Sequence, residues 1–386
     1  MKKKILFILL LIAGWTNVAS AQNIVKAQYI EETELVAVVA HLAEVNGYVW
    51  NEEEAGVYDY FTDVDKYFAP YMSHPLISLV KKKLFGAGFN WHFPMHVALR
   101  LELKDNRITY KKDLKADFDG YYERITPKDE QKFIRLLEDF YTVSHFHDFF
   151  TQHLPLYAAC EKAMQKVIEQ IDFDWYRTFF GTRQNSSFHI YLGLLCGPGN
   201  YAIHQQTTSG MEYINAVMGC CIRNKEGKVY YGQEYTLPII IHECNHSYCN
   251  PLNEEFWEDI QEKMTDFFRL NAKFYADEAY GSPILVANET FVEACAMRYL
   301  MSHPIKFDEE TLEAYRDFFK MPEATAEAIM TRYLDLLIET DEQKKKFFMI
   351  RPIIEILEER EAKPELYPTM RDFMPRYIET INAFKL

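Results

Sequence analysis

One short segment combines residue types that could bind a metal ion and use it for chemistry. His242 and His246 are four residues apart, and Glu243 directly follows the first histidine. Residues at this spacing lie one above the other on a helix, with Cβ atoms about 5–6 Å apart. Two such imidazoles can bind one Zn²⁺ at distances of about 2.0–2.1 Å. Glu243 would lie beside the metal's water without binding the metal, so we expect it to be the catalytic base.

The flanking residues predict that this segment is a buried helix. Thr236 could act as the N-cap, and Pro238 is tolerated in a first turn. Asn250 and Pro251 are expected to end the helix. The alternative is an ordinary surface helix that carries two histidines. The three isoleucines at 239–241 argue against it, because they would bury the helix.

A catalytic zinc usually takes three protein ligands and leaves one position for water. The metzincin pattern is excluded, because Leu252 occupies the place of its further histidine. Glu289 and Glu293 are again four residues apart, at the start of a predicted helix over 288–301. Both carboxylates would therefore share one face of that helix. One could bind zinc while the other accepts a hydrogen bond from a ligand imidazole.

These two motifs resemble those of the gluzincins, the thermolysin and aminopeptidase side of the zincin metallopeptidases. The resemblance covers residues 213–299 and implies that Glu289 is the third ligand and that Glu293 braces His242. The gap before Glu289 is longer than the gluzincin spacing, and a predicted extra helix over 257–274 fills it. Glu293 is therefore the competing ligand, with Glu254 and Glu255 as further alternatives. Residues 242–251 also resemble the core of an exported bacterial family of zincin-like proteins.

The resemblance implies two further parts of a peptidase site. Gluzincins use a Tyr or His to stabilise the oxyanion, and the sequence offers His303, Tyr299 and Tyr333 without choosing between them. An antiparallel edge strand that binds extended peptide should precede the active helix. Residues 213–218 are the candidate strand, and an ordinary core strand is the alternative.

Other histidines are weaker candidates for a metal site. His92 and His96 are also four residues apart, but Pro94 between them disfavours a pair of ligands on one helix. His145, His147 and His153 lie among polar residues, which favours a solvated segment.

The first residues predict export. Lys2, Lys3 and Lys4 precede an apolar run over 5–12, and Ala19-Ser20-Ala21 gives a small-residue cleavage pattern. We therefore interpret residues 1–21 as a signal peptide that is cut after Ala21, which predicts a periplasmic or extracellular protein. A retained membrane anchor is the alternative. No later segment is expected to span a membrane.

The net charge and the cysteine spacing argue against a nucleic-acid partner and against a disulfide-stabilised fold. The chain has 42 basic and 57 acidic residues and a net charge of −15, which argues against a nucleic-acid partner. Its seven cysteines are not spaced as a disulfide framework. Packed thiols are expected at Cys196, Cys220, Cys244 and Cys295. The pairs Cys220 with Cys221 and Cys244 with Cys249 could oxidise.

The sequence predicts an α+β fold of the zincin-like type, with a small mixed or antiparallel sheet, an active-site helix and a largely helical remainder. Residues 22–180 are expected to form a mainly helical N-terminal region, with helices over 34–42 and 154–171. Thr126, Pro127 and Asp129 mark the start of another helix. Residues 181–386 form the predicted catalytic region, with strands over 188–195, 213–221 and 229–231.

Together these features predict a zinc-dependent metallopeptidase that acts on a peptide or protein substrate. The alternative is an inactive zincin-like scaffold that binds zinc and a protein or glycan partner. The N-terminal region could also act as a propeptide or lid over the cleft.

Overall fold

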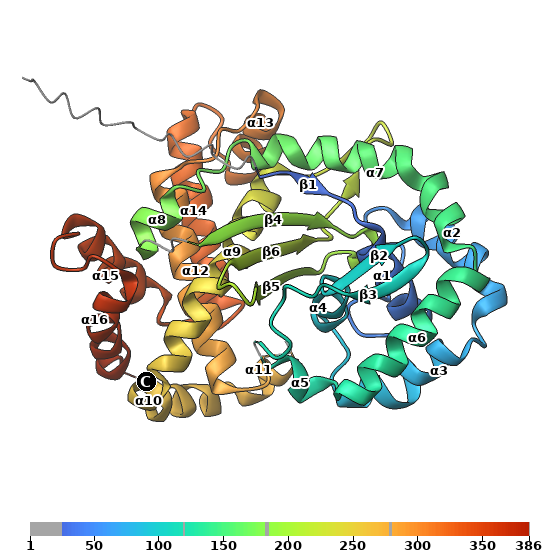
Figure 1. Cartoon of the computed structure of the whole chain (residues 1–386). Coiled ribbons are helices and arrows are strands. Elements are labelled where there is room, and N and C mark those ends of the chain that lie inside the picture. Colours follow the sequence, from blue (N-terminus) through green and yellow to red (C-terminus); the bar gives the residue numbers. More distant parts are fainter. Residues whose placement is uncertain (1–24, 119, 182–184, 278–279, 386) are drawn as a thin grey trace, which may run out of the picture.

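The computed structural model describes residues 25–385 apart from 119, 182–184 and 278–279. It confirms the predicted α+β class, with a small central sheet among many helices (Figure 1). The predicted signal peptide lies outside the described residues. Among the helices of the described chain, none has the length and apolar character needed to cross a bilayer.

A four-stranded mixed sheet lies at the centre of the molecule, in the order β1-β4-β6-β5. Parallel pairing joins β1 to β4 and β4 to β6, whereas β5 runs antiparallel to β6. Two small hairpins, β2-β3 and β7-β8, lie outside this sheet. The strands are β1 Ala27–Gln28, β2 Leu101–Lys104, β3 Arg107–Tyr110, β4 Ser186–Leu192, β5 Asn200–Gln206, β6 Glu212–Met218, β7 Ile222–Arg223 and β8 Val229–Tyr230.

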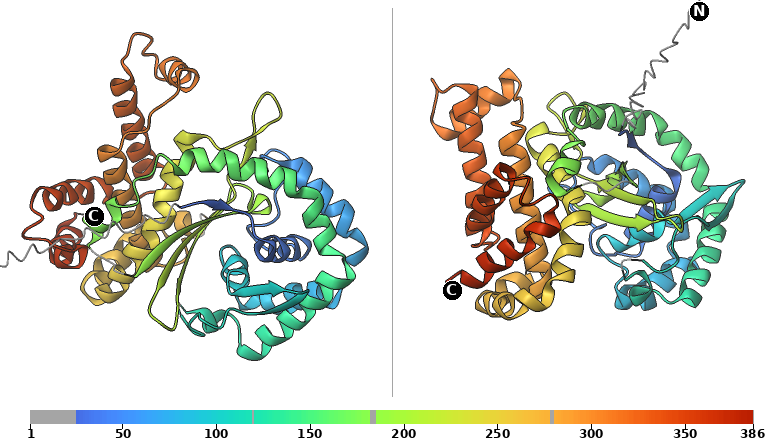
Figure 2. Two further views of the ribbon diagram at one scale, coloured as in Figure 1. Left: turned by 45° about the horizontal axis from the view of Figure 1, so that its top comes forward. Right: turned by 60° about the vertical axis from the view of Figure 1, so that its left-hand side comes forward.

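Most helices of the first half lie on one side of this sheet in Figure 2, whereas the short helix over 175–180 lies beside the helices of the second half. The predicted helix over 34–42 is confirmed as α1. The one over 154–171 corresponds to α7, which begins earlier, at Phe146, and ends earlier, at Ile168. Thr126 caps α6 as predicted, because its hydroxyl accepts a hydrogen bond from the Asp129 amide at 3.2 Å. The helices are α1 Glu31–Leu42, α2 Tyr58–Phe68, α3 Pro75–Leu79, α4 Phe93–Ala98, α5 Tyr121–Arg124, α6 Pro127–Val143, α7 Phe146–Ile168 and α8 Trp175–Phe180.

Helices of the second half form a layer on the other side of the sheet (Figure 2, right). In this layer α9 contacts β5 and β6, and α12 packs against α9 and α15. The predicted extra helix between the two motifs is present as α10 and α11. The helices are α9 Gln233–Glu255, α10 Trp257–Leu270, α11 Ala272–Asp277, α12 Pro283–Ser302, α13 Glu309–Phe319, α14 Ala326–Gln343, α15 Ile350–Ala362 and α16 Met370–Ala383.

The boundaries predicted for α9 are wrong at both ends. The helix begins at Gln233, so Thr236 is a buried residue within it and not its N-cap. Pro238 lies inside the helix and leaves the Glu234 carbonyl without its usual donor, and the hydroxyl of Tyr333 bonds this oxygen instead.

At its other end α9 continues past Pro251 to Glu255. A long-range contact holds this last turn, because the side-chain amide of buried Asn253 donates to Asn288 of α12 at 3.0 Å.

The predicted strands are shorter in the structure, and five strands were not predicted: β1, β2, β3, β5 and β7. A 3₁₀ turn over 194–196 ends β4 at Leu192, and β6 ends at Met218 just before Gly219. The longest of these five is β5, in which alternate residues such as Tyr201 and Ile203 are buried. The turn that leads into it contains Gly197 in the left-handed region, where a Cβ would collide with the Trp50 ring.

One continuous apolar core includes residues from α1 to α16. The division into residues 22–180 and 181–386 stays a prediction, since that core draws on both. All seven cysteines are free thiols, with Cys196, Cys244 and Cys295 buried as predicted and Cys220 half-buried.

Candidate metal centre

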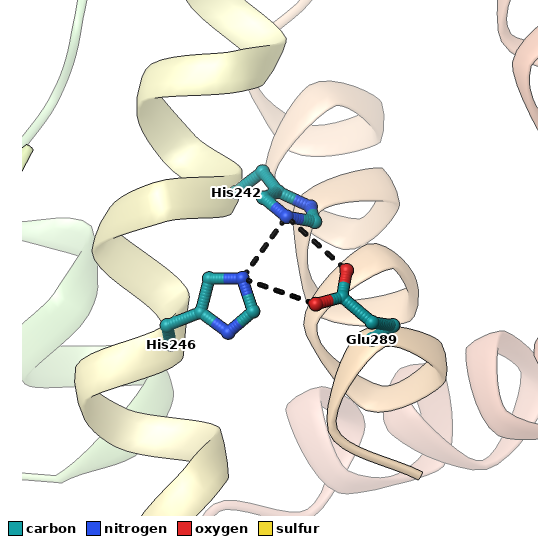
Figure 3. A group of neighbouring side chains, drawn as sticks. All are labelled: His242, His246 and Glu289. Carbon is teal, nitrogen blue, oxygen red and sulfur yellow. Dashed lines mark hydrogen bonds and ion pairs between the residues drawn. The ribbon is translucent and has the colours of Figure 1, made fainter. Parts of the chain in front are cut away.

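Two neighbouring helices bring three potential metal ligands together. His242 and His246 extend from successive turns of α9, and Glu289 extends toward them from α12 (Figure 3). The two Nε2 atoms lie 3.1 Å apart. The carboxylate oxygens of Glu289 lie 3.5 Å from His242 Nε2 and 3.7 Å from His246 Nε2. Among the described residues, this is the one group of three or more metal-ligating side chains whose ligand atoms all lie within 4.8 Å of one another.

The other ring nitrogen of each histidine has its own acceptor. His242 Nδ1 faces Glu293 Oε1 at 3.4 Å, and His246 Nδ1 faces Asn250 Oδ1 at 3.1 Å. These acceptors can each take the Nδ1 proton in a hydrogen bond, so each Nε2 can offer its lone pair to a cation. The two Nε2 atoms face each other and the Glu289 carboxylate. The three side chains therefore could hold a metal ion.

Glu243 lies in the same helix turn and is 8% exposed. Burial raises the pKa of its carboxyl group, and Glu289 and Glu293 raise it further, while His242 and His246 act in the opposite direction. A carboxylate in this environment binds a proton more readily than one in water, which suits a general base.

Two cavities, of about 500 and 520 Å³, flank the three ligands. Both are lined by His242, Glu243 and Glu289, and also by Asn200 of β5 and Tyr280. The first cavity extends along β5 toward His204, and the second extends toward α14 and Tyr333. A substrate could therefore extend from the ligands in two directions.

Comparison with known proteins assigns the chain to a family but gives no activity. A family model matches residues 28–320. The chain belongs to the family described as "Domain of unknown function (DUF4932)". No curated protein and no solved structure matches it. The DUF4932 match includes all three ligands and Glu243, whereas Tyr333, Asp341 and Lys345 come after it.

The two predicted carboxylates of α12 have different positions in this DUF4932 protein. Glu289 belongs to the group that could hold a metal, and Glu293 faces the far side of the His242 ring. Glu293 also forms an ion pair with Lys345, which in turn contacts Asp341 at 2.8 Å. Burial and then Glu293 raise the pKa of Asp341 to about 7. The alternatives Glu254 and Glu255 do not join the group, and Glu255 pairs with Arg371.

Two of the three predicted oxyanion donors lie away from the ligands. The Tyr299 hydroxyl accepts a hydrogen bond from the Asp172 amide at 2.8 Å, and the Tyr299 ring stacks on His303. Neither residue lines the two cavities. Tyr333 lines the second cavity, but its hydroxyl donates to the Glu234 carbonyl.

Tyr280 is a site residue that the sequence did not reveal. It lines both cavities, and its hydroxyl has no hydrogen bond to another described residue. Burial and then Glu289 raise its pKa, so the hydroxyl keeps its proton. Its only sequence signal is its position before the Gly281-Ser282-Pro283 turn.

The predicted peptide-binding strand is also wrong. Residues 213–218 belong to β6, which is paired on both sides, so the alternative of an ordinary core strand holds. The edge strand beside the ligands is β5. Asn200, Ala202 and His204 of β5 line the first cavity.

The other histidines do not join the three ligands. His92 and His96 line the first cavity, where burial above all lowers the pKa of each to about 3 and keeps the rings neutral. His147 contacts Glu31 at 3.0 Å, and His153 contacts Asp63 at 3.4 Å.

Proposed function

We propose that this protein is a zinc-dependent peptidase with a zincin-like active site. The observation that carries the proposal is the convergence of two imidazole Nε2 atoms and the Glu289 carboxylate beside the buried carboxyl group of Glu243. Two nitrogens and one carboxylate are a common donor set of catalytic zinc. The edge strand β5 next to α9, with a second glutamate-bearing helix, supports the zincin-like arrangement that the gluzincin resemblance implies.

The chemistry follows from what each side chain can do. His242, His246 and Glu289 would hold the ion. A bound zinc ion supplies Lewis-acid chemistry, lowering the pKa of a water to about 7 and polarising a substrate carbonyl. Glu243 accepts the proton of the attacking water and passes it to the leaving amine. Its burial supports this role.

Tyr280 is the best-placed donor for the oxyanion. Its hydroxyl is protonated, has no hydrogen bond to another described residue and lies where both cavities meet. A donor that is already in position stabilises developing charge without reorganisation.

The substrate of the proposed reaction is an extended peptide. In the described sheet β5 pairs with β6 on one side, so most of its outer edge can take another strand. Main-chain pairing along β5 would carry a peptide bond past the ligands, with side chains in the two cavities. The predicted signal peptide would place this activity outside the cytoplasm.

The decisive experiment measures metal content and turnover on the same sample. Purified full-length protein should bind one zinc per chain and cleave unstructured protein substrates. A chelator should abolish the cleavage, and added zinc should restore it. One zinc per chain without cleavage of any peptide would instead support the inactive scaffold. Absence of any transition metal after loading would refute the metal centre itself.

A further inference from the structure

Lys345 contacts the oxygen that faces a predicted metal ligand. Its Nζ bonds Glu293 Oε1, and this same oxygen lies 3.4 Å from His242 Nδ1. Lys345 is not a neighbour of either helix in sequence, because it follows α14. A cation from a third element therefore holds the carboxylate that contacts the His242 ring.

The local backbone fixes Lys345 in this position. The amides of Lys344 and Lys345 both donate to the Thr340 carbonyl, at 2.8 and 3.1 Å, and the Phe347 amide donates to the Asp341 carbonyl at 2.9 Å. The Phe347 ring is completely buried and anchors the segment. These bonds restrict the main chain at Lys345, so its ammonium group is held beside Glu293.

Asp341 gives Lys345 a second partner. Its carboxylate lies 2.8 Å from Lys345 Nζ and is only 3% exposed. Glu293 is 8% exposed, so two carboxylates are removed from water around one ammonium group. Buried charges are costly unless they are paired, and Lys345 is the cation paired with both.

We infer that Lys345 is a positioning residue of the metal centre, acting through Glu293. It holds Glu293 Oε1 against His242 Nδ1 and thereby keeps the Nε2 lone pair of His242 directed at the site of the ion. This inference rests on the metal site of the proposed function. Partners of ligand imidazoles orient the ring and increase its basicity, and their loss typically lowers metal affinity about 10- to 100-fold.

The experiment is a double-mutant cycle on zinc affinity, measured on the full chain by competition with a chromophoric chelator. Lys345→Met should weaken zinc binding about 10- to 100-fold, and Glu293→Gln should do the same. The double variant should bind no more weakly than Glu293→Gln, because both changes break one pathway to His242. Lys345→Arg should restore most of the affinity.

Arg298→Met is the matched control, because Arg298 is on α12, as Glu293 is, and pairs with Glu361, away from the three ligands. It should leave zinc affinity unchanged. Lys345→Met leaves the buried Asp341 carboxylate without its cation, which could prevent folding. The change is therefore also made together with Asp341→Asn, which removes that charge. That pair should still bind zinc more weakly than Asp341→Asn alone.

Two outcomes would overturn the role of Lys345. One is a folded Lys345→Met variant with wild-type zinc affinity. The other is a double variant with Glu293→Gln in which the two losses multiply, because Lys345 would then act independently of Glu293. A wild-type protein that binds no zinc would instead refute the proposed metal centre, so the two failures are distinguishable.

Discussion

Tyr333 of α14 donates its hydroxyl hydrogen bond to the main-chain oxygen of Glu234, the carbonyl that Pro238 leaves without its helical partner. This bond satisfies a carbonyl group that the proline leaves without a donor in the helix that carries both histidines. Tyr333→Phe should lower the free energy of unfolding by about 1–2 kcal/mol, because the carbonyl loses its donor.

Urea unfolding followed by circular dichroism would measure this loss. Tyr367→Phe is the control, since its hydroxyl has no such bond among the described residues, and it should change stability by less than about 0.5 kcal/mol. Equal stability of wild type and Tyr333→Phe would show that α9 does not need the bond.

Glu243→Gln should separate metal binding from turnover. The amide keeps the shape of the side chain but cannot accept a proton, so kcat should fall by about 10²- to 10⁴-fold. Zinc content should stay at the wild-type value, because Glu243 is not in the group of ligands. Metal analysis and a peptidase assay on one preparation would check both points, and full turnover would disprove the role as base.

Glu289 and Glu293 should differ in their effect on metal affinity. Glu289→Ala removes a ligand and should lose zinc under conditions where the wild type is saturated. Glu293→Gln removes a partner of His242 and should weaken binding only about 10- to 100-fold. Chelator competition on both variants would rank them, and the reverse order would make Glu293 the ligand.

Tyr280→Phe should lower kcat by about 10²- to 10³-fold with little change in KM or zinc content, because an oxyanion donor acts in the transition state. Tyr235→Phe is the comparison, since Tyr235 lines the second cavity but not the first. A Tyr280→Phe variant with unchanged kcat would remove Tyr280 from the mechanism.

Glu34 should make stability depend on pH. It is completely buried in α1, and burial raises the pKa of its carboxyl group to about 7, although a hydrogen bond from Tyr60 at 2.7 Å opposes the shift. The folded state thus binds the proton more tightly than the unfolded chain does. The stability that comes from the neutral carboxyl group is complete below about pH 4.5 and is lost as the pH rises through 7.

Glu34→Gln should remove this dependence. At pH 8 the variant should be more stable than the wild type, on the order of 2–3 kcal/mol, and at pH 4 the two should differ little. Thermal melts across this pH range would test it. If Glu34→Gln were less stable than the wild type at pH 8, burial of the ionised Glu34 carboxylate would not destabilise the fold, and the prediction would fail.

The sequence was most informative where the chemistry depends on one helix. The spacing of His242 and His246 determines their shared face, so both could be identified from sequence alone, and the same holds for Glu289 and Glu293. The choice between these two carboxylates needed the packing of α12 against α9. That packing places Glu289 at Nε2 and Glu293 at Nδ1 of His242.

The parts that the sequence did not predict depend on distant segments. Pro251 does not end α9, because Asn253 is held by Asn288 of another helix. The gluzincin resemblance implied an edge strand, for which residues 213–218 were the candidate, but sheet order is set by pairing between strands far apart in the chain. Tyr280 lies in a connection and Lys345 in a turn, where no periodicity marks a side chain as part of a site.

The position of Lys345 after the family-matched segment has a consequence for how the centre is completed during synthesis. A ribosome that has translated residues up to 320 has already made His242, His246 and Glu289, but not the ammonium group that bonds Glu293. Until α14 and the turn after it have been made, Glu293 lacks the ammonium group that pairs with it. The segment made after residue 320 therefore completes the set of charges around His242.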